Sequence, residues 1–143
     1  MAKLSFGSCY WSTPAATANV TGTPIKAAGT TTAVAEEDFT MSADNRLTYD
    51  GATTRWFEVL FTGSVTKAAG TTTQAEFSIY KDGVFITGSD VQRQIPSGDE
   101  GAFAVSCHTQ IDPGSYVELW CETVDTGNDL TIQHGVLSVK VLG

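Results

Sequence analysis

Apolar and polar residues alternate with a period of two along several stretches of the chain. The alternation is clearest in residues 55–66. Trp56 and Leu60 are the exceptions, since they add apolar side chains to the face that is otherwise polar. A period of two is typical of a β-strand with one buried face. The alternating apolar residues of this predicted strand are Phe57, Val59, Phe61 and Val65.

Residues 74–86 predict a β-hairpin. Asp82 and Gly83 form a two-residue loop that tolerates positive φ, and apolar residues flank it on both sides. A loop of this length sets which residues of the two strands face each other. The expected cross-strand pairs are Tyr80 with Phe85 and Ile79 with Ile86.

Alternation also predicts strands in residues 103–111, 116–122 and 130–142. Residues 112–114 (DPG) predict a turn between the first two, because Pro presets φ and Gly accepts the left-handed region. The last strand changes its apolar parity near His134, which predicts a β-bulge. Toward the N-terminus the pattern is weaker. Short strands are expected at residues 4–11, 24–28 and 46–49.

The stretches add up to about eight to ten short strands, with turn signals roughly every 8–12 residues and no helical stretch. They predict an all-β fold, an antiparallel β-sandwich of the jelly-roll kind. No linker divides the chain, so we expect a single domain. Residues 39–143 would form its core. Residues 1–38 would form an N-terminal arm with the first short strands, packed on the domain or exchanged with it.

One segment occurs twice: residues 26–32 and residues 67–73 both read KAAGTTT. The sequences diverge outside these segments, so a duplicated domain is not indicated. We expect two similar Gly/Thr-rich connections at the same end of the sandwich.

The composition supports the all-β prediction. The 143 residues include 21 Thr, 12 Val and 6 Ile but 7 Leu, and β-branched residues favour strands. The net charge of −8 argues against a nucleic-acid partner, which needs clustered Lys and Arg. No apolar run is long enough for a membrane-spanning helix, and none follows Lys3, so neither a membrane partner nor a signal peptide is expected.

Candidate catalytic residues are sparse. His108 and His134 each lie on a predicted strand without a second His at ligand spacing, and Cys107 and His108 would point to opposite faces of one strand. Neither G-x-S-x-G nor a phosphate-binding glycine motif occurs. We therefore expect a non-enzymatic protein without a cofactor.

Metal and disulfide sites are not indicated either. Cys9, Cys107 and Cys121 lack C-x-x-C spacing and are odd in number, so we expect three small apolar core residues. Carboxylates cluster on three predicted loops without the spacing of a calcium loop, which favours solvated acidic loops. These clusters are residues 36–38, 99–100 and 125–129.

Five aromatic residues lie near the N-terminus or opposite the main aliphatic stripes. They could form a second core layer, a subunit interface, where Trp and Tyr are enriched, or a surface on which carbohydrate stacks. As candidate subunit-interface residues we name Tyr10, Trp11, Trp56, Tyr116 and Trp120.

Taken together, four segments resemble small virion proteins of tailed bacteriophages, whose jelly roll is similar to the C1q/TNF-like fold. The resemblance covers about residues 39–141 and rests on pattern and spacing. The segments that carry it are residues 45–51, 53–59, 77–83 and 116–120.

The resemblance implies a homotrimer and two alternative roles. One is a capsid decoration (cement) protein that binds the outer surface of the major capsid protein, and the other is a receptor- or glycan-binding head of a tail fibre. A fibre usually needs a shaft, whereas this chain is nearly all domain, so we expect the decoration role. The protein would then be made in the host bacterial cytoplasm and reside on the virion surface, with its acidic coat facing solvent.

Overall fold

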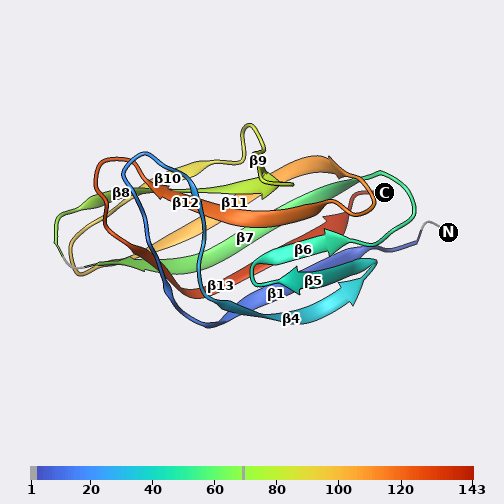
Figure 1. Ribbon diagram of the computed structural model, residues 1–143, viewed down its shortest axis with the longest axis horizontal. Coiled ribbons are helices and arrows are strands. Elements are labelled where there is room, and N and C mark those ends of the chain that lie inside the picture. Colours follow the sequence, from blue (N-terminus) through green and yellow to red (C-terminus); the bar gives the residue numbers. More distant parts are fainter. Residues whose placement is uncertain (1–2, 69) are drawn as a thin grey trace.

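The computed structural model describes residues 3–68 and 70–143, which form two antiparallel β-sheets packed face to face (Figure 1). Thirteen strands occur in these residues. The predicted all-β sandwich is confirmed. Within the described ranges no helix is long and apolar enough to cross a membrane.

The first sheet, called sheet 1, is built from long strands. Its order is β11 (Glu100–Ile111), β7 (Arg55–Lys67), β13 (Leu130–Val141), β1 (Phe6–Thr13) and β4 (Thr30–Glu37), with β2 (Ala16–Thr17) on β13.

The second sheet, called sheet 2, contains shorter pieces. Its order is β10 (Val91–Ile95), β8 (Thr73–Lys81), β12 (Tyr116–Thr123), β6 (Arg46–Tyr49) and β5 (Phe39–Ala43). In addition, β3 (Ile25–Lys26) pairs with β12, and β9 (Val84–Phe85) pairs with β8.

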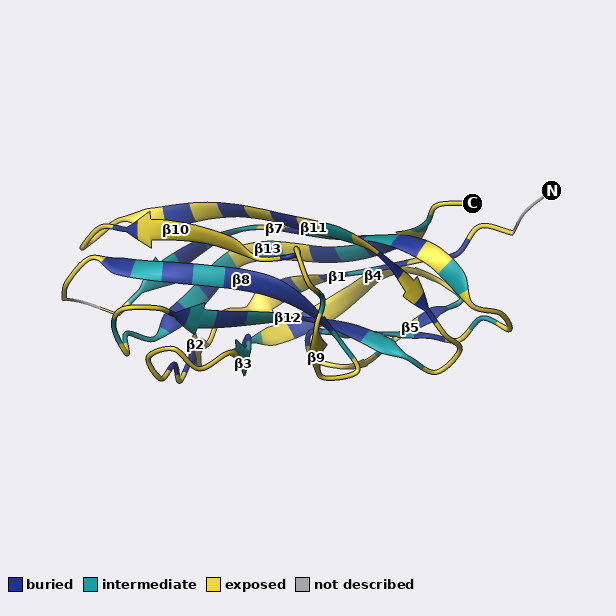
Figure 2. Ribbon diagram, turned by 90° about the horizontal axis from the view of Figure 1, so that it is seen from above, coloured by how far each residue is buried: buried dark blue, intermediate teal, exposed yellow. Residues whose placement is uncertain are grey.

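Aromatic rings fill the space between the sheets. Phe61 of sheet 1 stacks on Phe77 of sheet 2 with ring centroids 5.9 Å apart, and Phe103 lies 4.6 Å from Phe77. Along β11, buried and exposed residues alternate as the sequence predicts (Figure 2). Because each strand turns its apolar residues inward, the opposite residues form two outer faces, one on each sheet.

The predicted hairpin and bulge are both confirmed. Tyr80 pairs with Phe85, and the amide of Ile86 donates a 3.0 Å hydrogen bond to the carbonyl of Ile79. Asp82 has a φ of 52° and Gly83 a φ of 77°, as a two-residue turn between twisted strands requires. The register of β13 on β7 shifts between Ile132 and His134.

The N-terminal residues are part of the sandwich. β1 lies between β13 and β4, and Asp38, with a φ of 59°, turns the chain from β4 in sheet 1 to β5 in sheet 2. The strands β1, β2, β3 and β4 are therefore paired within their own chain. β4 was not predicted because Thr31 is its one buried residue and the strand does not alternate.

Both copies of the repeated segment cross between the sheets. Residues 26–32 lead from β3 to β4, and residues 67–73, of which Ala69 lies outside the described residues, lead from β7 to β8. The Ala27 amide donates to the carbonyl of Leu119 within β12, whereas the Ala68 amide donates to that of Asp129 before β13. The copies are alike as crossovers, but the expectation that they lie at the same end is wrong.

The three cysteines are free thiols. Cys9 and Cys121 are buried core residues, as predicted, and Cys107 is partly buried against the same core. Burial raises the pKa of each of the three thiols to about 11, so the reactive thiolate form is scarce at neutral pH.

Candidate functional site

The five aromatic residues that the sequence singled out are not brought together in one site. Trp11 is 4% exposed, its ring packs edge-on against Phe61 at 5.5 Å, and its indole N–H donates to the carbonyl of Ala28 at 2.9 Å. Trp11 is therefore a core residue of the single chain rather than an exposed one. The other four residues lie on the two outer faces.

The outer face of sheet 1 carries Tyr10 and Trp56. The register places Tyr10 beside Val136, which in turn faces Thr62 on β7. Tyr10 and Val136 are each 42% exposed, Trp56 is 52% exposed and Phe6 is 37% exposed. Large apolar side chains are thus exposed on a continuous five-stranded sheet. The strands of this sheet are held together by backbone hydrogen bonds and do not depend on these side chains.

Charged groups are few at the centre of this face. In the part of the chain that the structure describes, the outward positions of β7 and β13 carry two charged side chains, Glu58 and Lys140. These two pair with each other, Lys140 Nζ to Glu58 Oε1 at 3.3 Å, and His108 Nε2 lies 3.5 Å from Glu58 Oε2. The centre of the face is therefore close to neutral, and the uncharged side chains of Ser8, Thr62 and Ser138 lie there between the exposed apolar ones.

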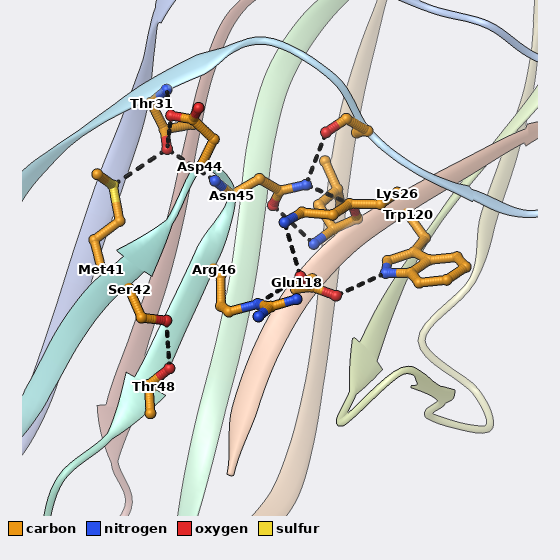
Figure 3. A network of polar contacts seen from close by, with 12 residues as sticks. Lys26, Thr31, Met41, Ser42, Asp44, Asn45, Arg46, Thr48, Glu118 and Trp120 are labelled. Atoms are coloured by element: carbon orange, nitrogen blue, oxygen red, sulfur yellow. Dashed lines mark hydrogen bonds and ion pairs between the residues drawn. The ribbon is translucent and has the colours of Figure 1, made fainter. Parts of the chain in front are cut away.

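The outer face of sheet 2 has a different character, because a buried ion cluster holds it together (Figure 3). Glu118 is 2% exposed and accepts hydrogen bonds from Lys26 Nζ at 2.9 Å and Arg46 Nε at 2.8 Å. The indole N–H of Trp120 donates a third, at 3.2 Å. Burial would raise the pKa of Glu118, but these hydrogen bonds outweigh it and hold the pKa below its ordinary value.

Aromatic rings surround this cluster. The Trp120 ring stacks on Tyr80 with centroids 4.1 Å apart and planes 5° apart, and Tyr80 also contacts Phe85 of the β9 hairpin. The Arg46 guanidinium lies 4.0 Å from the centroid of Tyr116. Tyr116 and Trp120, both predicted as interface residues, are thus half-buried members of one network on sheet 2.

Asn45 closes a gap beside this network, and the sequence analysis missed it. Its Nδ2 donates to the carbonyls of Ala27 at 3.1 Å and Leu119 at 2.7 Å, and its Oδ1 accepts from the Leu119 amide at 2.9 Å (Figure 3). Asn45 has a φ of 54°, a conformation that Asn tolerates better than most residues. The sequence shows an Asn in the short turn before β6, which indicates a turn residue. It does not indicate the partners of this Asn, because they are distant in sequence.

Two carboxylates face each other further along sheet 2. Glu122 of β12 is opposite Glu76 of β8, and the amide of Gln92 donates to Glu76. Burial and the nearby charge of Glu76 raise the pKa of Glu122. Like charges directly opposite on neighbouring strands destabilise a sheet.

Both histidines considered as catalytic candidates lie on the surface. His108 meets Glu58 on an exposed surface, and His134 lies exposed at the bulge. Over residues 3–68 and 70–143, no three His, Cys, Asp or Glu side chains are placed to hold a metal ion. Carboxylates of two predicted acidic loops instead cap backbone amides, Glu36 that of Met41 and Asp125 that of Gln74.

No protein-family model matches this chain, and no curated protein matches it either. Solved structures do. Murine APRIL at pH 5.0 matches with a TM-score of 0.62 and 10% identity, and murine APRIL at pH 8.5 with 0.61 and 9%. Each match covers 98% of this chain and 100% of that chain. The globular domain of zebrafish complement 1qA protein matches with a TM-score of 0.49 and 10% identity, over 97% of this chain and 98% of that one.

At this level of identity the likeness concerns the fold. The two antiparallel sheets and the match to APRIL over nearly the whole chain agree with the jelly roll predicted from the sequence. The chain has the jelly-roll fold of the TNF/C1q type.

Proposed function

We propose that this protein is a non-enzymatic structural protein that forms a homotrimer through the outer face of sheet 1 and decorates the capsid of a tailed bacteriophage. The observation that carries the proposal is the outer face of sheet 1 itself. Tyr10, Trp56 and Val136 are exposed there, and the two charged residues among them, Glu58 and Lys140, form an ion pair with each other. Exposed Trp and Tyr with few charges are typical of the core of a protein interface.

The side chains of this face favour a cyclic arrangement over a two-fold one. The half formed by β1 and β13 carries bulky residues, whereas the outward positions of β11 carry short side chains from Ala102 to Ser106. In a head-to-tail contact the bulky half of one copy packs on the flat half of the next, and rotation closes the ring. The bulky residues are Phe6, Tyr10 and Val136, and the short ones are Ala102, Ala104 and Ser106.

The capsid role rests on the resemblance of the sequence to small virion proteins. The charge distribution agrees with it, because the carboxylates that give the net charge of −8 are concentrated outside the centre of the sheet 1 face. A trimer formed through that face would therefore keep an acidic outer coat, which favours solubility at high copy number.

Sedimentation velocity tests the trimer. In about 0.5 M NaCl, which screens surface charges, we expect the wild-type protein to sediment as a trimer. Val136→Asp buries a charge in the interface and should raise the dissociation constant by ~100-fold or more, leaving single chains. Val20→Asp is the matched control, because Val20 is an exposed valine on the loop between β2 and β3. A wild-type protein that sediments as single chains at tens of micromolar contradicts the trimer.

Co-sedimentation with capsids tests the decoration role. Shells stripped of their decoration protein should bind the wild-type trimer and bind Val136→Asp far more weakly, because three linked contacts become one. An intact trimer that does not bind the shells contradicts this role. If that trimer bound glycans of the host surface, the fibre-head alternative would replace it.

A further inference from the structure

The outer face of sheet 2 has an excess of positive charge at one end of β12. Lys26 and Arg46 share the single carboxylate of Glu118, and their side chains remain 31% and 33% exposed. Arg46 uses Nε for that contact, and its two terminal nitrogens have no partner among the residues described. A cation with unused donors is therefore available in a protein whose net charge is −8.

The other end of the same strand has an excess of negative charge. Glu122 and Glu76 are directly opposite each other, and in residues 3–68 and 70–143 neither makes an ion pair. The Gln92 amide donates to Glu76, but no positively charged side chain of these described residues offsets the repulsion between the two carboxylates. A cation brought from outside would relieve it.

Trp120 lies midway between the two ends. Along β12, Glu118 precedes Trp120 by two residues and Glu122 follows it by two, so all three side chains point outward. At about 3.3 Å per residue, the Cα atoms of Glu118 and Glu122 are some 13 Å apart. Tyr80 under the Trp120 ring and the exposed Phe85 beside it extend the apolar centre. Trp, Tyr and Arg are the residues that dominate binding energy in interfaces.

We propose that this face binds the same face of a second copy of the chain, with the two β12 strands antiparallel across a two-fold axis. The axis lies in the plane of contact, perpendicular to β12 at Trp120. It places the charged ends of Lys26 and Arg46, which meet at Glu118, over Glu122 of the other copy, and it places the two aromatic centres on each other. Glu76 lies one strand further on, on β8, and adds to the negative charge that these two cations face. With the strands parallel, like charges would meet instead.

Both halves of this contact are present on one chain, which identifies a second copy as the partner. A two-fold contact needs a self-complementary surface, and the symmetric spacing about Trp120 supplies one. The contact uses the sheet opposite to the proposed trimer interface. It would therefore link trimers to one another, or pair single chains where the trimer is broken.

The experiment uses Val136→Asp as background, so that the sheet 1 contact is absent. In about 0.05 M NaCl this variant should sediment as a dimer, and in about 0.5 M NaCl as single chains, because salt screens the crossed ion pairs. Adding Glu76→Lys and Glu122→Lys makes both ends of the face positive. We expect this to raise the dimer dissociation constant by ~50-fold or more.

Asp99→Lys with Glu100→Lys is the matched control in the same background. It changes the net charge by the same amount at the start of β11, on the other sheet, so general repulsion between chains alters equally, and the dimer should remain. Single chains in 0.05 M NaCl, or a dimer that survives Glu76→Lys/Glu122→Lys, would overturn the proposal. If the protein stayed as single chains and its Trp fluorescence changed on addition of a uronic-acid oligosaccharide, the proposal would be overturned as well. The face would then bind a saccharide instead of a second copy.

The outcomes for the two proposals are separable. A wild-type trimer in high salt together with a monomeric Val136→Asp in low salt supports the proposed function and overturns this inference. A wild-type protein that never exceeds a dimer, and loses it with Glu76→Lys/Glu122→Lys, supports this inference and overturns the trimer.

Discussion

The two sheets are held together in different ways. In sheet 1, β7 pairs without interruption with β11 from Arg55 to Thr66, and with β13 on its other side. In sheet 2, β6 pairs with β12 at Tyr116 and Val117, and β3 pairs with it at Trp120 and Cys121. The Asn45 side chain takes the place of a backbone neighbour between these two pieces.

This difference decides what the outward residues can do. A continuous backbone ladder places no demand on them, so the outer face of sheet 1 can carry exposed aromatic residues suited to a partner. The outer face of sheet 2 needs particular polar side chains for its own cohesion. We therefore expect substitutions on the outer face of sheet 1 to leave stability nearly unchanged, and substitutions in the Asn45 and Glu118 network of sheet 2 to lower it.

The largest effect on stability is expected from Asn45→Ala. It leaves the buried amide and carbonyl of Leu119 and the carbonyl of Ala27 without this partner, and we expect a loss of about 4 kcal/mol in the free energy of unfolding. Urea unfolding followed by Trp fluorescence measures the loss. Ser138→Ala, in the middle of β13, is the sheet 1 control and should change the value by less than ~0.5 kcal/mol. Similar losses for both variants would contradict the comparison.

The next effect is expected from Glu118→Ala, which removes the one carboxylate that Lys26 and Arg46 share. A broken buried ion pair can cost about 3–5 kcal/mol, but both cations reach solvent here, so we expect about 2 kcal/mol. Glu58→Ala is the matched control on sheet 1, since Glu58 also faces two basic groups but is 30% exposed. It should cost less than ~1 kcal/mol. An equal cost for both would show that burial of Glu118 is not what matters.

Sequence patterns predicted the parts of the fold that depend on neighbouring residues. The Asp82 and Gly83 turn, the bulge near His134 and the alternation along β7 are all local. The contacts that join the pieces of sheet 2 are not local, because Asn45 contacts Leu119 and Arg46 contacts Glu118, and more than 70 residues separate the members of each pair. The periodicity of apolar residues along a strand does not reveal partners that are so far apart in sequence.

The burial of the five aromatic candidates could be predicted only in part, for a related reason. β1 has large apolar residues on both parities, Phe6 and Tyr10 on one and Trp11 on the other, so its pattern does not say which side is buried. The structure shows that the Trp11 side of β1 is the buried one, because Trp11 packs against Phe61. The split of Tyr116 and Trp120 from Tyr10 and Trp56 likewise depends on which strands share a sheet.

The smallest effect is expected from pH, and it sharpens the contrast within sheet 2. Glu118 has a lowered pKa, so its contribution to stability is present above the ordinary Glu pKa of 4.5 and is lost as the pH falls through the lowered value. Glu122 has a raised pKa, so its contribution is present below 4.5 and is lost as the pH rises through the raised value. Two carboxylates four residues apart thus respond to acid in opposite directions.

Glu122→Gln removes one of the facing charges and should therefore stabilise the fold by about 0.5 kcal/mol at pH 7, with no gain near pH 4. Glu118→Gln should destabilise it at pH 7, and that loss should shrink on acidification. Urea unfolding of both variants at the two pH values measures this, in the Val136→Asp background and about 0.5 M NaCl so that self-association does not contribute. If Glu122→Gln destabilised the fold at pH 7, the facing carboxylates would not be the source of repulsion on which the two-fold contact is argued.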